Sequence, residues 1–521
     1  MTVRGYRLGV DWSRRGTYAG TLEDVSSYVL DSPALTVSYG RDTSQASTDA
    51  GAGKLSFALR NDGRQFSPEN SGSPIAGRVV PGTPAELTVT QASSGTIRTL
   101  FGGVIDDLDA DPNAPAKDFT AECLDAWGRP GAEKLSTPVH SGLRTGDAIN
   151  VVLDLIGWRG GRDVDPGATV MPWWWEEGTD AATAVSRIVA SEGPPAIAHV
   201  DGGTFVFRDR HHRLTRSASQ TAQATFTHIV PAGSGPAGDF KVLRGSFGYQ
   251  HGLKNIINAA AFEVAQRAPG PLSEVWSTDT PIVLAAGESL ALDVQTSDPF
   301  VGAITPAAGT DYELAYGSVT VSLSRTSGQA TTVTLTAGGV AAMLTRLAVR
   351  ATPLTVARSV KVMEEDTSSI GTYGRQTWPG ELPWASVHDA RAIAQRIVAT
   401  YATARPVVAF AIANISDDYL TQILARRISD RITVRNDELG LNRDFIIERI
   451  THTITKLGVI HQVEFACEVP EPSQPANVFT FGVAGKGFNQ GAFGVNGIDN
   501  PASMFTFDVA GKGFNQGVFA S

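Results

Sequence analysis

Five consecutive residues form the densest set of side chains that could act on a substrate: Trp173, Trp174, Trp175, Glu176 and Glu177. Tryptophan rings stack on sugars, and paired carboxylates are what glycoside hydrolysis requires. Consecutive residues of an extended segment point to opposite faces, however, so the three rings cannot form one platform there. We therefore favour packing of this run between the helices expected in residues 145–191 over a glycan site.

Four aspartates occupy positions 1, 3, 5 and 12 of a calcium-loop template: Asp107, Asp109, Asp111 and Asp118. Pro112 stands where that template needs glycine, and Asp118 replaces its bidentate glutamate. The flanking segments look like strands, whereas the template lies between helices. A solvated hairpin loop is therefore preferred to a calcium site.

The adjacent histidines His211 and His212 lie in a basic run, residues 208–216. Such a run is typical of a solvated hairpin end rather than of a metal site. The sequence contains no G-x-S-x-G, no H-E-x-x-H and no phosphate-binding Walker loop. We expect no catalytic residue, no cofactor and no metal, so that the protein is not an enzyme.

Composition describes a large globular chain of 521 residues with 42% hydrophobic residues, 54 glycines and 28 prolines, which favours short strands and many turns. Its net charge of −10 argues against binding of nucleic-acid phosphates. Cys123 and Cys467 cannot form a disulfide scaffold and are interpreted as small core residues. We expect no apolar leader and no membrane span, since the most apolar stretch, residues 407–415, is too short.

Alternating apolar residues predict strands in residues 1–135, where Leu55, Phe57 and Leu59 precede a turn at Asn61, and we assign this region to an N-terminal barrel. Residues 136–220 are expected to form an inserted α+β domain. In it, Thr145 caps one helix, a second helix starts at Thr179, and a hairpin turns at residues 201–203.

The remainder of the chain returns to β structure. Residues 221–270 lead back to the barrel framework, and the alternation in residues 271–380 predicts a β-sandwich-like domain. Residues 381–470 should form a C-terminal barrel with one helix, because Ser386 and Asp389 make a capping box before an apolar face. The predicted fold class is mainly β, with two hub-type barrels, the α+β insertion and the sandwich.

Residues 471–521 contain a linker and two glycine-rich copies of one motif, with a period of 26 residues. Each copy is too short to fold alone, so we expect it to order against another chain or a second copy. Aromatic side chains recur at fixed offsets and are the candidate partner-docking residues: Phe479, Phe481, Phe488, Phe493, Phe505, Phe507, Phe514 and Phe519.

The order of these features resembles the tail hub, or minor tail, proteins of phages that infect actinobacteria, which are similar to the central hub proteins of phage baseplates. The likeness covers residues 1–470 through the order of elements. The segments that carry it are LSFALRNDGRQFSP at 55–68, PGTP at 81–84, LFGGVID at 100–106, ISDRITV at 428–434, FIIERITH at 445–452 and FACE at 465–468.

This resemblance implies a structural protein of the virion, made in the cytoplasm of the host bacterium. In it, a homotrimer forms a ring at the distal end of the tail tube, two barrels per chain facing a hexameric tube. The implied partners are a tail tube or distal tail protein, tip or fibre proteins for host attachment, and a tape measure protein. DNA would pass through the ring during genome ejection without specific binding.

Two other classes of function compete with this one. A cell-wall glycan-binding or glycan-cleaving tail protein would act through Trp173 to Glu177, and peptidoglycan cleavage by the purified protein would favour it. A secreted adhesin built on the C-terminal repeats is disfavoured by the expected lack of a signal peptide.

We predict that the repeats dock a tip component and are not needed for folding. Alternation puts Phe479 and Phe481 on one face of a strand, which suits addition to the edge of a partner's sheet. Truncation after Val469 should leave the oligomeric state and the thermal midpoint unchanged, yet yield tails that lack a tip component. A truncated chain that fails to fold would assign the repeats to the core.

Overall fold

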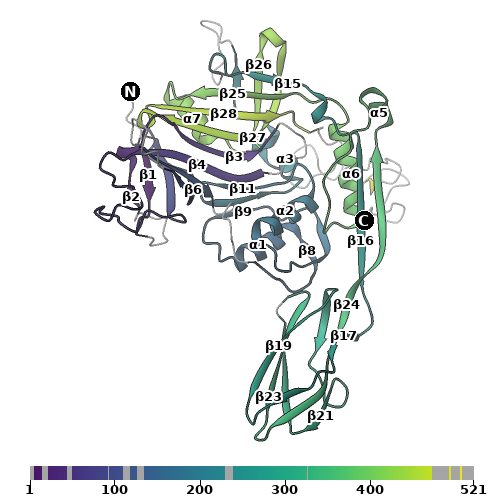
Figure 1. The fold of residues 1–521 in the computed structure, drawn as a ribbon. Coiled ribbons are helices and arrows are strands. Elements are labelled where there is room, and N and C mark those ends of the chain that lie inside the picture. The colour runs from purple at the N-terminus through teal and green to yellow at the C-terminus, as the bar shows by residue number, and fades with distance from the viewer. Residues whose placement is uncertain are drawn as a thin grey trace.

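The computed structural model describes residues 5–13, 22–43, 50–91, 93–109, 118–125, 134–228, 239–325 and 327–471, together with the backbone of 492–493 and 505–506. The chain is mainly β with an inserted α+β unit, as predicted. Figure 1 shows a curved sheet, a helical unit beside it and a long arm that projects away from both. No helix in the described ranges is both long and apolar enough to cross a membrane.

The main sheet takes strands from both ends of the chain. The N-terminal strands are β1 (Gly5–Val10), β2 (Glu23–Asp24), β3 (Leu35–Arg41), β4 (Ala50–Arg60), β5 (Pro84–Gln91), β6 (Thr96–Asp109) and β7 (Asp118–Asp125). The later strands are β13 (Thr225–Thr227), β14 (Asp239–Lys241), β15 (Gly248–Gln250), β25 (Val407–Ala413), β26 (Arg431–Asn436), β27 (Leu441–Thr455) and β28 (Ile460–Glu468). Within the described residues these 14 strands run β14-β13-β26-β27-β3-β4-β7-β6-β5-β1-β2, with β28, β25 and β15 continuing from β27.

The ladder between β3 and β27 joins the two ends of the chain. Tyr39 lies opposite Ile450, and Val37 lies opposite His452. Strands β3 and β27 contribute Leu35, Val37, Ile450 and Ile454 to one buried cluster, which also holds Phe57 of β4 and Phe465 of β28. The strands expected for the N-terminal and C-terminal barrels therefore share one hydrogen-bonded sheet and one core.

The local predictions for the N-terminal strands are confirmed. Leu55, Phe57 and Leu59 are fully buried, as their alternation requires. The Asn61 side chain accepts a hydrogen bond from the Phe66 backbone N–H (2.9 Å) and donates one to the Ser67 hydroxyl (2.9 Å), which fixes the predicted turn.

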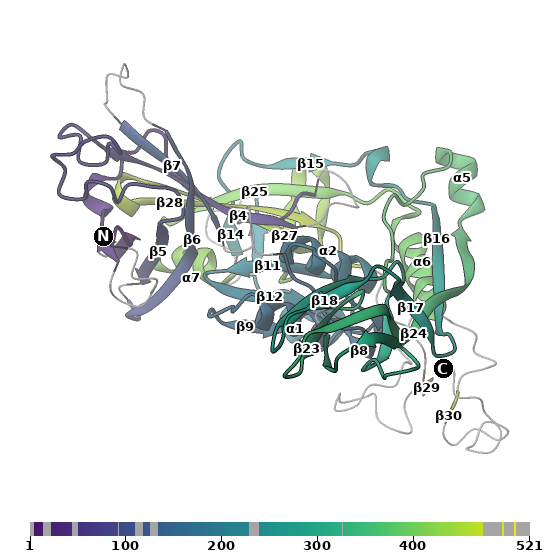
Figure 2. The same ribbon diagram turned by 60° about the horizontal axis from the view of Figure 1, so that its bottom comes forward.

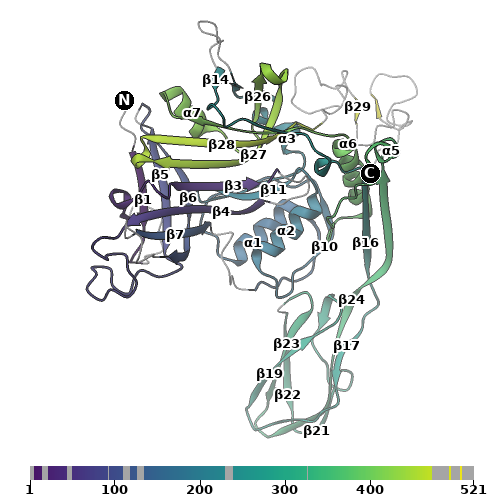
Figure 3. The ribbon, with the colours of Figure 1, turned by 45° about the horizontal axis from the view of Figure 1, so that its top comes forward.

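The inserted unit contains β8 (His140–Arg144), α1 (Thr145–Leu155), β9 (Arg162–Val164), β10 (Val170–Trp174), α2 (Ala181–Glu192), β11 (Ile197–Asp201), β12 (Thr204–Arg208), α3 (His212–Thr215) and α4 (Ser217–Gln220). Helices α1 and α2 pack against each other, and β11 lies against β3 and β4 of the main sheet (Figure 3). The predicted hairpin is present, with Gly202 and Gly203 at positive φ between β11 and β12.

The predicted starts of the two inserted helices are each shifted by a residue or two. Thr145 is not the cap of α1 but its first residue: it is buried, and its hydroxyl donates to the Glu192 carboxylate (2.7 Å) instead of to the helix end. Helix α2 is capped by Asp180, which accepts from the Thr183 backbone N–H (2.9 Å). The Thr145 hydroxyl thus bonds a residue distant in sequence, Glu192, instead of the helix end that the local pattern predicted.

The arm begins with two long paired strands, β16 (Ala259–Pro269) and β24 (Ala342–Glu365). It ends in a distal unit made of β17 (Ser273–Thr278), β18 (Ile282–Leu284), β19 (Ser289–Gln295), β20 (Phe300–Ile304), β21 (Tyr312–Tyr316), β22 (Val319–Arg325) and β23 (Ala330–Ala337). Two sheets close over a separate core that includes Leu284, Val333 and Leu344, as expected of a sandwich (Figure 2).

Three helices follow the arm: α5 (Thr367–Tyr373), α6 (Val387–Tyr401) and α7 (Asp417–Ala425). The capping box of α6 is confirmed, since the Ser386 hydroxyl accepts from the Asp389 backbone N–H (3.0 Å). Its predicted apolar face packs on β16 and β24. Among the described residues, the short 3₁₀ helices are η1 (Ser26–Tyr28), η2 (Leu253–Asn255), η3 (Asp437–Leu439) and η4 (Lys456–Gly458). Near the C-terminus, β29 (Ala492–Phe493) pairs with β30 (Phe505–Thr506).

Buried histidines lie at the β3–β27 ladder. His452 Nδ1 is 2.9 Å from His461 Nε2, and His461 Nδ1 is 2.7 Å from the Tyr6 hydroxyl. Burial lowers the pKa of His452 to about 3, where Asp201 favours the charged form but Arg98 and Arg427 oppose it. Burial likewise lowers the pKa of His199 to about 4. Both imidazoles are therefore neutral in the folded protein at neutral pH.

We predict that acid destabilises this ladder. Below pH 6.5 the unfolded chain protonates His452 while the folded chain does not, so the free energy of unfolding falls as the pH drops toward 4. Each such histidine contributes about 1.4 kcal/mol per pH unit in that window. Urea unfolding between pH 7.5 and 4.5 should show that the free energy of unfolding depends less steeply on pH for His452→Gln than for the wild type. Equal slopes for wild type and His452→Gln would contradict this account.

Candidate functional site

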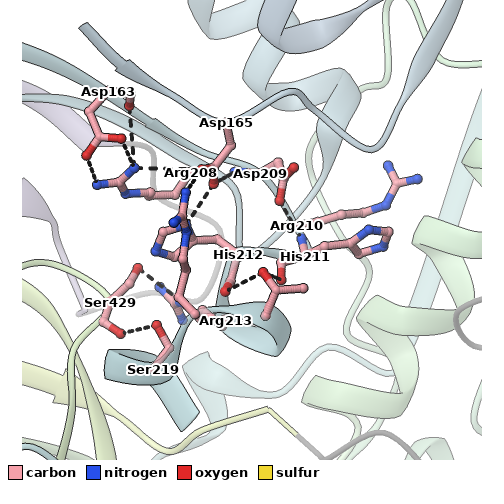
Figure 4. A network of polar contacts seen from close by, with 12 residues as sticks. Asp163, Asp165, Arg208, Asp209, Arg210, His211, His212, Arg213, Ser219 and Ser429 are labelled. Carbon is pink, nitrogen blue, oxygen red and sulfur yellow. Dashed lines mark hydrogen bonds and ion pairs between the residues drawn. The ribbon is translucent and has the colours of Figure 1, made fainter. Parts of the chain in front are cut away.

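Much of the basic run at 208–216 is buried, contrary to the prediction of a solvated hairpin end, and only its last two residues, Thr215 and Arg216, are exposed. The side chains of Arg210 and Arg213 are each 9% exposed, and both meet carboxylates from distant segments. The prediction was wrong because a local window shows the cations but not the acids that fold over them. We call Arg208, Arg210 and Arg213 with their partners the junction network. Figure 4 shows the part of it around Asp163, Asp165 and His212.

The first part of the junction network lies within the inserted unit. Arg208, at the end of β12, donates to the Asp163 carboxylate (2.8 Å). Asp165 is 2.7 Å from Nδ1 of His212 and accepts from the Asp209 backbone N–H (3.2 Å). Burial alone would raise the pKa of Asp165, but its hydrogen bond and attraction to His212 outweigh burial and lower it. This carboxylate is therefore ionised and holds the turn after β12.

Arg210 ties two helices together. Its guanidinium donates to the Glu192 carbonyl oxygen (3.1 Å) at the end of α2 and to the Asp389 carboxylate (3.2 Å) in the first turn of α6. The Arg210 backbone N–H also donates to the Glu192 carboxylate (3.3 Å). The inserted unit is thereby fixed against the helix that covers the base of the arm.

Arg213 reaches the main sheet. Its guanidinium lies 2.7 Å from the carboxylate of Glu448 on β27. A second arginine, Arg41 at the end of β3, lies 3.4 Å from the same carboxylate. Arg41 pairs in turn with Glu468 of β28 (2.9 Å). Burial would raise the pKa of Glu448, but Arg213 and Arg41 lower it below its ordinary value. Two cations and two anions thus neutralise each other where the three strands and the inserted unit meet.

Sequence reasoning missed Arg41, Glu448 and Glu468, although one signal was present. Glu448 and Arg449 interrupt the apolar run from Phe445 to Ile450, and the β27–β28 ladder shifts register between Ile447 and Arg449. Such a bulge places two residues opposite one and turns a side chain to a new direction. A charge inside an apolar strand was therefore the available hint of a buried ion pair.

The tryptophan run, Trp173–Trp175, does not form one platform, as predicted. Trp174 is fully buried in the core of the inserted unit beside His140. Its neighbours face the arm instead: Trp173 Nε1 donates to the Arg267 carbonyl oxygen (3.2 Å), and Trp175 Nε1 donates to Oε1 of Gln329 (3.3 Å). The three rings serve packing between units rather than a common surface.

Glu176 is also part of this packing. It is 1% exposed, accepts from Arg187 of α2 (2.9 Å), and its backbone N–H donates to the Thr137 hydroxyl (2.9 Å). Burial raises its pKa against the opposing hydrogen bond of Thr179 and the charge of Arg187. Glu176 therefore links α2, through Arg187, to the segment around Thr137 at the start of the inserted unit.

The remaining candidates fall in different places. Asp107 and Asp109 end β6 and Asp118 begins β7, so the flanks are strands as expected, while Asp111 lies outside the described residues. Among the described residues, no group of three or more His, Cys, Asp or Glu side chains is arranged to hold a metal ion. Cys123 and Cys467 are buried free thiols whose pKa values are raised by burial, which confirms them as core residues.

The docking candidates lie outside the part of the chain whose side chains are described. Only the backbone of Phe493 and Phe505 is given, and these two residues are opposite each other in the β29–β30 pair. The others are Phe479, Phe481, Phe488, Phe507, Phe514 and Phe519.

Comparison with solved structures finds matches that cover most of the chain at low sequence identity. No family model and no curated protein matches this sequence. A tail protein from Neisseria meningitidis MC58 is 12% identical with a TM-score of 0.46, covering 89% of this chain and 96% of that one. The 43 kDa tail protein of prophage MuSo2 from Shewanella oneidensis is 11% identical with a TM-score of 0.45, covering 90% and 99%.

A third similar structure is the E. coli c3393 protein, a component of the type VI secretion system described as similar to the phage T4 tail proteins gp27 and gp5. It is 9% identical with a TM-score of 0.36, covering 91% of this chain and 81% of that one. The structural neighbours are thus phage tail proteins and a secretion component that resembles phage tail proteins.

We predict that the junction network is essential for stability. Replacing Arg213 with methionine keeps much of the volume but leaves Glu448 with a single cation, and breaking a buried ion pair costs about 3 kcal/mol. Urea unfolding should show that loss for Arg213→Met, whereas the exposed Arg391→Met on α6 should change stability by less than about 0.5 kcal/mol. Equal midpoints for the two variants would show that Arg213 is not needed.

Proposed function

We propose that this protein is a structural component of a phage tail, the hub at the tip of the tail tube. One observation carries the proposal. The segments that resemble hub proteins, residues 55–68 and 100–106 on one side and 428–468 on the other, are far apart in the sequence but lie in one sheet. The β3–β27 ladder and a single core join them, which is what two halves of one framework require.

The polar and aromatic clusters favour a structural role over catalysis. The junction network neutralises its own charges, and the tryptophan run is engaged by Arg267 and Gln329 of the arm. Glu176 is closed off by Arg187 and Thr137. These groups are used to fix one unit against another, so we propose that the protein has no enzymatic activity.

We propose that three copies form a ring that binds the tail tube or a distal tail protein and organises tip or fibre proteins, with a tape measure protein as a further partner. The net charge of −10 suits a passage for DNA, because like charge disfavours contact with the phosphate backbone. Host attachment and genome ejection would then depend on this ring.

We propose that the C-terminal repeats are tethered docking peptides. Arg405 donates to the carbonyl oxygens of Val469 and Pro470, and Arg396 of α6 pairs with Glu471. These contacts fasten the end of the hub core, so a truncation that tests the repeats alone should keep Glu471. Two copies on one tether also raise the effective concentration of the second binding event.

The decisive experiment is a mass measurement combined with localisation. Light scattering of the purified chain should give about three times 55.0 kDa, and electron microscopy of antibody-labelled tails should place the label at the distal end. A chain that is monomeric both free and in the particle would contradict the ring. Label along the tube or on the capsid would contradict the tip position.

A further inference from the structure

The base of the arm narrows to a two-stranded neck, residues 265–268 paired with residues 355–359. Every residue from 355 to 359 is exposed, Val356 to 47%. The ladder shifts register between Gln266 and Arg267 within this neck. Helix α6 covers the strands below it, where Phe262, Val264 and Val362 are buried, but no described core residue lies in the neck itself. An isolated pair of strands is marginally stable in water, so the neck is the weakest connection along the arm.

Beside the neck, one cluster of contacts joins the inserted unit to the arm, and we call this cluster the latch. Trp173 and Trp175 form its body side, Gly328 and Gln329 form its arm side, and Arg267 of the neck itself lies between them. The Arg267 guanidinium lies 5.1 Å from the centre of the Trp175 ring, and its carbonyl oxygen accepts from Trp173. A Cβ on Gly328 would lie 2.9 Å from Cδ1 of Trp175, so that only glycine allows this approach.

Each side of the latch is supported by its own unit. On the arm, Gln329 donates to the Ser297 carbonyl oxygen (2.9 Å), and its backbone N–H donates to the Ser327 hydroxyl (3.1 Å). On the body, Trp175 packs edge-on against Trp384, with ring centres 4.9 Å apart. The cores of the inserted unit and of the distal unit share no residue. The two sides can therefore separate without unfolding either unit.

From these contacts we propose that the arm is a hinged element, held in one orientation by the latch and free to swing at the neck when the latch opens. The hydrogen bond from Trp175 to Gln329 and the close approach of Trp175 to Gly328 hold the arm beyond the neck, while the two contacts of Arg267 hold the neck to the body. This inference rests on the contacts alone and does not depend on the proposed tail function.

A reversible disulfide tests the latch in the full chain. The Cβ atoms at positions 175 and 328 would be 3.0 Å apart, slightly closer than a disulfide requires, so the pair Trp175→Cys and Gly328→Cys should join after a small shift. The native Cys123 and Cys467 are buried and do not compete. Both redox forms of this variant lack the Trp175 indole. The oxidised form should keep the wild-type scattering profile because the disulfide replaces the latch contact, and the reduced form, which has no such link, should show a larger maximum dimension.

Hydrogen exchange supplies the second measurement. Backbone amides of the neck should exchange roughly tenfold faster in the reduced variant than in the oxidised one, the factor expected for loss of about 1.4 kcal/mol. Gly328→Ala, which crowds Trp175, should behave like the reduced variant. Gly339→Ala is the matched control, because a Cβ there meets nothing within 4 Å.

The outcomes separate clearly. Failure of the two cysteines to join in the folded chain would show that the latch contact does not form in solution, and would overturn the proposal. Identical scattering and neck exchange in the oxidised and reduced forms would show a rigid arm and would also overturn it. Because those two forms are the same chain, a folding defect of Gly328→Ala would not affect the comparison.

Discussion

The antiparallel ladder between β3 and β27 is the interaction on which the rest of the structure depends. It pairs β3, which starts at Leu35, with β27, which ends at Thr455, so strands from opposite ends of the chain become neighbours in one sheet. Side chains from both strands enter the same core, and separating them would expose Val37, Ile450 and Ile454 together. Along the chain, the inserted unit lies between β7 and β13 of this sheet, and the arm lies between β15 and β25.

Buried charge sets a second constraint. Glu448 has no exposed side-chain surface, and an unpaired carboxylate there would be very costly. Arg41 from the N-terminal strands and Arg213 from the inserted unit both approach it, so the carboxylate is satisfied only when three separate parts of the chain are in place. Removing any one of these partners would leave a buried charge unpaired, so we expect the network to favour the native relative positions of those parts.

The inserted unit and the arm are attached in different ways. The inserted unit is fixed by the junction network and by contact of β11 with β3 and β4. The arm has its own core and contacts the inserted unit through the tryptophan run. A framework with one rigidly fixed insertion and one lightly held extension suits a protein whose proposed work is to position other proteins.

Local patterns in the sequence determined the strands and helices. Alternation placed Leu55, Phe57 and Leu59 in the core, the capping box placed α6, and the pleat ruled out a single platform of Trp173, Trp174 and Trp175. These features were predictable because each depends on residues only a few positions apart. Tertiary structure alone decided that Arg210 and Arg213 are buried, that Thr145 bonds Glu192 instead of capping a helix, and that Trp175 meets Gly328. The partners in those contacts are separated by 18 to 235 residues, and their meeting follows from how the sheet closes rather than from any local preference.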